Sequence, residues 1–158
     1  MTLTSVTFTA NGSLTGAAVT RNGGACYATS DFSATECTFI TNRSASIGGA
    51  VNQPGGGTTT LERCTFRSNS SVGSGGAVNT AASSQIIVTA STFESNTTNS
   101  EGGAIYDGNS PSISVNGCSF ISNASFGAGG AMRFASSGTT FNGCTFTTNT
   151  SAQSAGGV

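Results

Sequence analysis

The chain has 158 residues, of which 7% are charged, and its formal net charge is −1. It contains no lysine and its five arginines are scattered, so the composition excludes a nucleic-acid partner, which would require clustered cations. No apolar run approaches the length of a membrane span, and the low net charge together with regularly recurring apolar residues excludes a disordered chain.

Two short patterns alternate along the whole chain. Phe-x-x-Asn occurs six times, with successive phenylalanines 31, 27, 27, 27 and 26 residues apart. Gly-Gly-Ala begins nine residues after the phenylalanine at Gly48, Gly75, Gly102 and Gly129. A repeat of this length predicts a repeat array rather than an ordinary globular domain. The repeated residues are Phe8, Phe39, Phe66, Phe93, Phe120 and Phe146, and Asn11, Asn42, Asn69, Asn96, Asn123 and Asn149.

A single repeat domain is expected over residues 1–158. The N-terminus lacks the basic segment and apolar core of a signal peptide, and the last repeat stops at Val158 before its next strand, so we expect a segment of a longer solenoid. In the first repeat the glycine copy is either Gly16–Val19 or Gly23–Cys26, and both choices place a small insertion between Thr20 and Asp31. The coils are expected near residues 1–31, 32–58, 59–85, 86–112, 113–138 and 139–158.

Each repeat begins with a segment in which apolar or small residues alternate with polar ones, as a strand with one buried face requires. The inward positions lie seven, five and two residues before the phenylalanine. The alternation slips once, at two polar or turn-forming residues such as Glu62-Arg63, which predicts a corner between two strands.

A second corner is expected at the asparagine, because Asn tolerates left-handed backbone angles and bonds to nearby main chain. The paired glycines then give the backbone freedom before a third short strand. No window shows the 3.6-residue period of a helix. The pattern therefore predicts an all-β fold, a parallel β-solenoid (β-helix) of about six coils of 26–27 residues with three short strands per coil. The third strands are expected at Ala50-Val51, Ala77-Val78, Ala104-Ile105 and Ala131-Met132.

In such a stack the six phenylalanines form a core column and the six asparagines form an amide ladder. Each of these asparagines also begins an Asn-x-Ser/Thr sequence. One interpretation is a column of glycans, which needs a secretory host and amides that face water. The other, which we favour, is an inward ladder whose following hydroxyl supports the corner. The hydroxyl residues are Ser13, Ser44, Ser71, Thr98, Ser125 and Ser151.

Four of the five cysteines share one inward column with a valine and a serine. This substitution pattern favours small, buried packing groups over metal ligands. Cys37 and Cys64 are expected on adjacent coils, as are Cys118 and Cys144. We expect free thiols, because strand direction in a parallel stack makes a disulfide awkward. Cys26, in the insertion, is expected to be the exposed thiol.

The outward position directly before each phenylalanine forms a rank of hydroxyls, which is the candidate exposed binding face. Ice-binding solenoids use paired, flat ranks of threonine, so ice binding is an alternative function. The neighbouring outward column includes Arg67 and Glu94, so charge interrupts a second rank. The simpler interpretation is that Thr is a favourable exposed strand residue. The rank consists of Thr7, Thr38, Thr65, Thr92, Ser119 and Thr145.

The sequence shows no constellation typical of catalysis. Few acidic residues recur in one column, and without His or Lys the usual proton carriers are absent. Polysaccharide lyases share the β-helix but use clustered Asp for calcium and a basic catalytic residue, so a polysaccharide-active enzyme is the less favoured alternative. We predict no catalytic residue, no metal ligand and no cofactor.

The alternation of Phe-x-x-Asn with Gly-Gly-Ala-Ile/Val resembles the repeat of the polymorphic outer membrane proteins, the chlamydial-type adhesins. The resemblance covers essentially the whole chain, with six copies of the first pattern and Gly-Gly-Ala before Val51, Val78, Ile105 or Met132. It implies a right-handed parallel β-helix that forms the exposed passenger of an outer-membrane autotransporter and works in adhesion.

We therefore predict a non-enzymatic extracellular or cell-surface module that acts as an adhesin or a structural rod. The expected partners are a protein or glycan receptor and further copies of the chain, stacked end to end into filaments. Neither nucleic-acid binding nor membrane insertion by this segment is expected.

Overall fold

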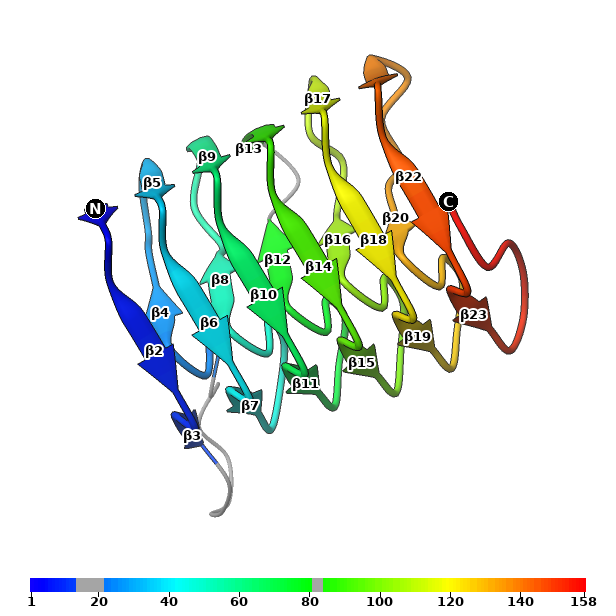
Figure 1. Ribbon diagram of the computed structural model, residues 1–158, viewed down its shortest axis with the longest axis horizontal. Coiled ribbons are helices and arrows are strands. Elements are labelled where there is room, and N and C mark those ends of the chain that lie inside the picture. The colour runs from blue at the N-terminus through cyan, green and yellow to red at the C-terminus, as the bar shows by residue number, and fades with distance from the viewer. Residues whose placement is uncertain (14–21, 81–83) are drawn as a thin grey trace.

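The computed structural model describes residues 1–13, 22–80 and 84–158. All regular structure in these ranges is β-strand, and the strands lie in four parallel sheets. Successive coils stack along one axis, with the N-terminal and C-terminal coils at opposite ends (Figure 1). The structure thus confirms the predicted all-β parallel β-solenoid.

The first sheet lies along the upper edge of the solenoid in Figure 1. Its strands pair with the inward positions in register, so that Ile86 lies over Thr59 on one side and Ile113 on the other. The strands are β1 (Thr2–Thr4), β5 (Phe32–Thr35), β9 (Gly57–Glu62), β13 (Ser84–Thr89), β17 (Ile113–Asn116) and β21 (Thr139–Asn142).

A residue with positive φ joins the first sheet to the second in every coil. Glu36 and Arg63 have φ values of 54° and 50°, whereas the last two coils have Gly117 and Gly143 at the same place. The left-handed conformation turns the chain and shifts the side-chain alternation by one residue. The corner therefore lies where the slip in the alternation predicted it.

The second sheet faces the viewer in Figure 1. Its central residues are the phenylalanines of the repeat, and Phe66 pairs with Phe39 and Phe93 in the neighbouring strands. The strands are β2 (Thr7–Thr9), β6 (Thr38–Ile40), β10 (Thr65–Arg67), β14 (Thr92–Glu94), β18 (Ser119–Ile121) and β22 (Thr145–Thr147).

The second corner also has a left-handed residue, but this residue is not the asparagine. The residue before it, such as Thr41 or Ser68, has φ of 53° or 54°. The prediction that Asn itself takes the left-handed angle is wrong, because the asparagine is held inside the coil by its side-chain hydrogen bonds.

A fourth strand of two residues follows this corner in each coil, in addition to the three strands that the sequence predicted. These short strands form the third sheet, along the lower edge in Figure 1. Their polar residues carry no strand alternation that a sequence pattern could reveal. The strands are β3 (Gly12–Ser13), β7 (Arg43–Ser44), β11 (Ser70–Ser71), β15 (Thr97–Thr98), β19 (Ala124–Ser125) and β23 (Thr150–Ser151).

The fourth sheet closes the back of the first five coils after the paired glycines. In the first coil Cys26 pairs with Val51, so Gly23–Cys26 and not Gly16–Val19 is the glycine copy. The extra residues of this coil therefore precede Gly23, mainly outside the described residues. The strands are β4 (Cys26–Tyr27), β8 (Val51–Gln53), β12 (Val78–Thr80), β16 (Ile105–Asp107) and β20 (Met132–Arg133).

The two glycines of each pair are required for different reasons. Gly75 has a φ of +74°, which side chains rarely allow. Gly76 lies so close to the next coil that an added Cβ would overlap the carbonyl oxygen of Gly103. The first glycine therefore turns the chain, and the second lets two coils come into contact.

Candidate functional site

The phenylalanine column forms the centre of the solenoid core. Neighbouring rings have centroids 4.6 to 5.1 Å apart and interplanar angles of 6° or less. This separation matches the spacing of paired strands, so the backbone register dictates the stack. Phe39, Phe66, Phe93 and Phe120 are 0% exposed and no ligand can reach them.

The asparagine ladder lies at the corner between the second and third sheets. At Asn69, the backbone N–H and Nδ2 both donate to Asn96 Oδ1, at 3.0 and 2.9 Å, and Nδ2 also donates to Phe39 O at 2.9 Å. The same three bonds recur at Asn42, Asn96 and Asn123. All four asparagines are 0% exposed. Each rung thereby joins three successive coils, and its side chain has no access to solvent.

The hydroxyl residues that follow the four buried ladder asparagines by two positions are buried as well, namely Ser44, Ser71, Thr98 and Ser125. Ser71 Oγ lies 2.5 Å from Gly73 O and 3.1 Å from Gly75 O, which share its single hydroxyl hydrogen, and Ser125 Oγ donates to Gly127 O at 2.9 Å. These bonds hold the turn that leads to the paired glycines. At Asn42, Asn69, Asn96 and Asn123 the geometry corresponds to an inward ladder with a supporting hydroxyl and leaves no room for a glycan.

The cysteine column lies inside the first corner. Cys37, Cys64 and Cys118 are 1% exposed, Cys144 is half-buried, and all are free thiols. Burial raises the pKa of Cys64 to about 11 and also raises the pKa of Cys118. Cys64 and Cys118 are therefore neutral packing groups at neutral pH.

Cys26 is buried, at 5% exposed, so the expectation that it is the exposed thiol is wrong. Its strand β4 continues the inward column of the fourth sheet and places Cys26 beside Val51. Burial raises the pKa of this free thiol to about 11. The spacing of the first repeat concealed this alignment, since the extra residues shift Cys26 along the sequence.

The hydroxyl rank lies on the outer side of the second sheet. Thr65 pairs in register with Thr38 and Thr92, and the rank continues through all six strands. The neighbouring outward column carries Arg67 beside Glu94, together with isoleucines. This face therefore presents one continuous hydroxyl rank and not two.

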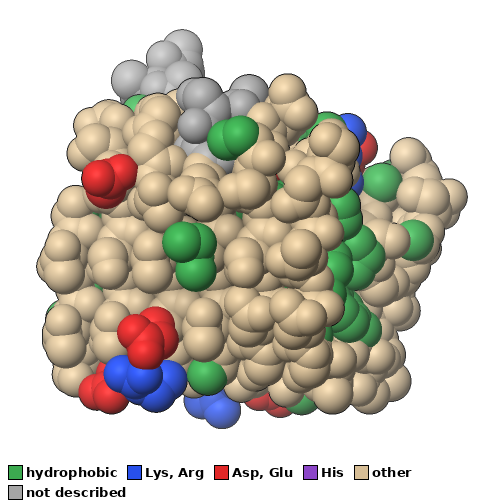
Figure 2. Space-filling model, turned by 90° about the horizontal axis from the view of Figure 1, so that it is seen from above, with side chains coloured by type: hydrophobic (Ala, Val, Ile, Leu, Met, Phe, Trp, Pro, Cys, Tyr) green, Lys and Arg blue, Asp and Glu red, His purple; other side chains and the backbone are tan. Residues whose placement is uncertain are grey.

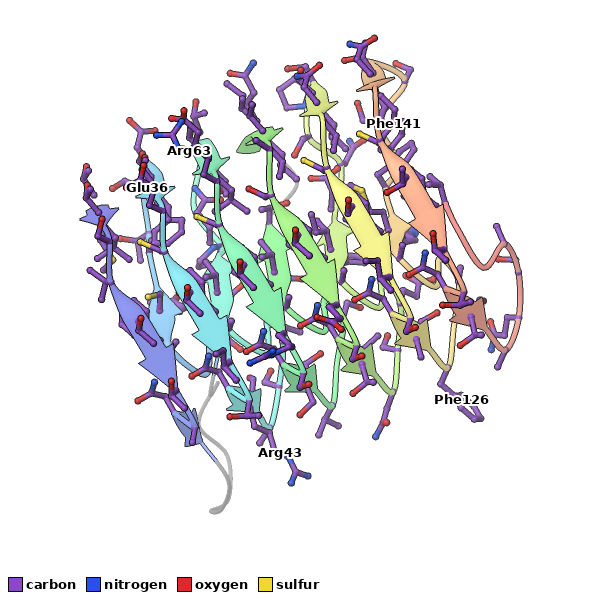
Figure 3. All side chains as sticks on the ribbon, in the orientation of Figure 1. Glu36, Arg43, Arg63, Phe126 and Phe141 are labelled. Atoms are coloured by element: carbon purple, nitrogen blue, oxygen red, sulfur yellow. The ribbon has the colours of Figure 1, made fainter. Side chains whose placement is uncertain are left out.

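A row of variable side chains follows the third sheet. Val72, Asn99 and Phe126 occupy the same position in successive coils, and the backbone N–H of each donates to a carbonyl of the preceding coil at 3.1 to 3.3 Å. Val72 is 48% exposed, and Phe126, at 69%, is the most exposed large apolar residue in the described ranges. Arg43 and Phe126 both project from the lower edge of the molecule (Figure 3). We call Val72, Asn99 and Phe126, together with Arg43 in the third-sheet strand β7, the third-sheet ridge.

A small ion-pair cluster lies at the corner between the first and second sheets. Arg63 Nε is 3.2 Å from Glu36 Oε1, and the guanidinium also pairs with Glu62. Glu36 and Arg63 lie close together on the outside of the coils (Figure 3). Seen from above, uncharged polar side chains and backbone make up most of the surface, and charged side chains gather mainly near one edge (Figure 2).

The sequence did not reveal that the outward column of the fourth sheet is partly buried. Asn52 and Asn79 are 0% and 6% exposed, and Asn79 Nδ2 donates to Asn52 Oδ1 at 2.7 Å. The turn at Gly48 lies against this column, since a Cβ there would be 3.0 Å from Asn52 Cβ. The column continues to Tyr106 and Arg133, whose guanidinium carbon lies 5.3 Å from the Tyr106 ring centroid. The Val-Asn pair at one offset in two coils was the available signal.

Asp107 is a buried carboxylate that the sequence did not single out. It is 0% exposed and accepts hydrogen bonds from Thr80 Oγ1 at 3.0 Å, from Ser110 N at 2.8 Å and from Ser110 Oγ. These neutral donors fasten the end of β16 to the following turn. Within the described residues, no three or more His, Cys, Asp or Glu side chains form a group that could hold a metal ion. None of the described segments forms a helix of the length and apolar character that spanning a bilayer requires.

The model of the Chlamydia polymorphic membrane protein repeat matches residues 5–29 and residues 90–108. Each stretch contains one Phe-x-x-Asn and one Gly-Gly-Ala copy. No curated protein and no solved structure matches the chain. The two matched stretches are similar to that repeat, and the parallel β-solenoid in which the repeats stack in register fits the similarity.

Proposed function

We propose that the chain is a non-enzymatic extracellular or cell-surface module that acts as an adhesin or a structural rod. The observation that carries this proposal is the division between inside and outside. In the central coils the Phe-x-x-Asn side chains are buried, whereas the exposed side chains that follow the third sheet, Val72, Asn99 and Phe126, differ from coil to coil. A constant interior with a variable exterior is a scaffold on which a binding surface can be built.

The third-sheet ridge is the surface that we assign to a receptor. Its backbone is fixed by hydrogen bonds between coils, so binding would not have to order a loop. Aromatic and arginine side chains such as Phe126 and Arg43 are the types that contribute most at protein interfaces. The salt bridges of the described residues do not involve Arg43, which leaves its guanidinium for a carboxylate of the partner. The ridge therefore fits a protein receptor that has an apolar pocket for Phe126 and, three coils along the stack, an acidic group for Arg43.

Binding of the labelled chain to cultured epithelial cells tests this assignment. We expect saturable binding that falls about tenfold or more in the double variant Phe126→Ser, Arg43→Ser. The matched control is Thr65→Ser, Thr92→Ser on the second sheet, which should bind like the unchanged chain. Loss of binding after protease treatment of the cells identifies a protein receptor, whereas loss after glycosidase treatment transfers the proposal to a glycan. Absence of saturable binding contradicts the adhesin role and leaves that of a structural rod.

Ice binding is a second candidate because the hydroxyl rank is continuous and in register. The charges of Arg67 and Glu94 in the neighbouring column count against it. Thermal hysteresis of the purified chain decides, and Thr92→Lys should abolish any such activity. Absence of hysteresis removes this candidate. Release of unsaturated sugars from acidic polysaccharides in the presence of calcium would contradict the non-enzymatic part of the proposal.

End-to-end association of copies belongs to the rod role. Core residues in the first and last coils are only partly buried, and a hollow of about 290 Å³ lies beside β20. A further coil from any source would cover these groups, and a second copy stacked head to tail would place its Phe8 over Phe146. Sedimentation velocity over a range of concentrations should show growing oligomers. A monomer at every concentration would contradict self-stacking. The partly buried groups are Leu3, Val6, Phe8, Phe141, Cys144 and Phe146.

A further inference from the structure

The six Asn-x-Ser/Thr sequences combine a modification signal with a core position. Enzymes that transfer oligosaccharide to asparagine act on this sequence and require an amide that faces water. In the folded chain Asn42, Asn69, Asn96 and Asn123 are 0% exposed. The sequence signal and the folded environment therefore make opposite demands on the same side chain.

The hydrogen bonds of the ladder leave no amide hydrogen for a sugar. An asparagine side chain has two N–H groups. At Asn96, one is directed to Phe66 O at 3.0 Å and the other to Asn123 Oδ1 at 2.9 Å. A glycosidic bond replaces one of these hydrogens, so one partner in the core would lose its donor. The sugar would also have to fit between two coils whose backbones are in hydrogen-bond contact there.

We propose that N-glycosylation of these four asparagines and closure of the solenoid are mutually exclusive. The unfolded chain is an acceptor and the folded chain is not, so a chain that meets an N-glycosylating enzyme before it folds is held unfolded. This proposal is independent of the adhesin role.

The chemistry requires a lipid-pyrophosphate-linked oligosaccharide as the second substrate. The Asn Nδ2 attacks the anomeric carbon, the new N–C bond forms, and the bond from that carbon to the phosphate oxygen breaks. The lipid pyrophosphate leaves with the electron pair, and one amide proton is lost. No step in this scheme breaks the new N–C bond again, so a glycosylated chain would stay unfolded.

Asn11 provides an internal contrast. It is exposed, and its Nδ2 donates to Asn42 Oδ1 at 3.0 Å. The second amide hydrogen of Asn11 therefore makes no hydrogen bond to a neighbouring coil, and the residue is exposed to solvent. A glycan on Asn11 is compatible with the fold, although the sequence around Asn11 carries the same signal as the other five.

Cell-free translation into endoplasmic-reticulum microsomes tests the proposal, with a cleavable signal peptide placed before the chain. The products are treated with protease after the microsomes are opened, and resistant and sensitive molecules are mapped by mass spectrometry. We expect resistant molecules to carry glycans on Asn11, on Asn149 or on neither, because Asn149 Nδ2 likewise donates only one hydrogen bond, to Phe120 O. Sensitive molecules should carry glycans on one or more of the four buried asparagines. A parallel reaction with an inhibitor of lipid-linked oligosaccharide synthesis should raise the resistant fraction several-fold.

Three results would overturn the proposal. One is a protease-resistant molecule with a glycan on any of the four buried rungs. Another is the absence of glycans from all four rungs in the microsomal products, since the unfolded chain would then not be an acceptor. The third is a resistant fraction that the inhibitor leaves unchanged, because the glycan would then not be the cause of misfolding.

Discussion

At the scale of one residue, Thr59 shows that the core of the solenoid contains a polar side chain that does not contribute a hydrogen bond. Its Oγ1 is buried without a hydrogen-bond partner, in the inward column between Phe32 and Ile86. Thr59→Val keeps the shape and removes the unpaired hydroxyl, so we expect the free energy of unfolding to rise by about 1 kcal/mol. Urea unfolding measures the change. Thr60→Val, on the outward side of the strand, is the control, and a loss of stability in Thr59→Val would show that the hydroxyl is bonded.

Ala90 is held in a left-handed conformation with a φ of 48°. The same corner has Gly117 and Gly143 in later coils, and an added Cβ there meets nothing within 4 Å. Crowding is therefore absent, and only the backbone preference of an L-residue disfavours Ala. Relief of that strain exceeds the extra entropy glycine gains on unfolding, so Ala90→Gly should stabilise by about 0.5 kcal/mol.

Gly75→Ala tests the opposite case in the same unfolding experiment. Gly75 has a φ of +74°, and a Cβ there would overlap the Val78 carbonyl oxygen. Strain and overlap add, so we expect a loss of about 2 kcal/mol or more. Equal effects of Ala90→Gly and Gly75→Ala would contradict the different roles of the two turns.

The asparagine ladder acts at the scale of the element, because each rung serves its neighbours. Asn69→Ala leaves the N–H and Nδ2 of Asn42 without their acceptor and Phe39 O without its side-chain donor. Each buried group left unpaired costs about 1–3 kcal/mol, so the total loss should be about 3 kcal/mol or more. Asn99→Ala on the exposed ridge is the control, with a change within about 0.5 kcal/mol. Similar midpoints of urea unfolding for the two variants would show that the asparagine ladder does not stabilise the solenoid by this amount.

The buried thiols make the stability of the solenoid depend on alkaline pH. Burial raises the pKa of Cys26 and of Cys64 from 9.0 to about 11, so the folded state keeps these protons at pH values where the unfolded state has lost them. This contribution is complete below pH 9 and is lost as the pH rises through 11. Unfolding midpoints from pH 8 to pH 11 should fall more steeply for the unchanged chain than for Cys26→Ala, Cys64→Ser. Parallel curves would contradict a thiol origin.

The whole molecule behaves as a stack of interchangeable coils, because every sheet keeps one register across coils. Deletion of residues 86–112 joins Gln85 to Ile113, which occupies the place of Ile86. We expect this shortened chain to fold, with a lower melting temperature since one interface between coils is lost. Deletion of residues 86–111 shifts the next coil by one residue and turns its inward side chains outward, so it should not fold. Circular dichroism and limited proteolysis distinguish the two products.

Position in the sequence determined most of the interior of this protein. Phe-x-x-Asn and Gly-Gly-Ala recur at fixed distances, and in a parallel stack a fixed distance means a shared column. The fold, the first corner and the inward phenylalanines followed from that relation alone. Asn69 was also expected inside, although its pairing with Phe39 O could not be foreseen because that bond joins residues in different coils.

Only the tertiary structure decided the features that depend on how coils meet. The left-handed angle falls on Ser68 and not on Asn69, because the asparagine side chain must point into the stack. Cys26 is buried because strand pairing, and not its distance from Phe8, assigns it to a column. Phe126 and Val72 form part of an exposed ridge because coil-to-coil hydrogen bonds align turns that share no sequence motif. The repeat determines which residues stack on one another in successive coils. The exposure of each residue depends instead on the neighbouring coils and turns that cover it.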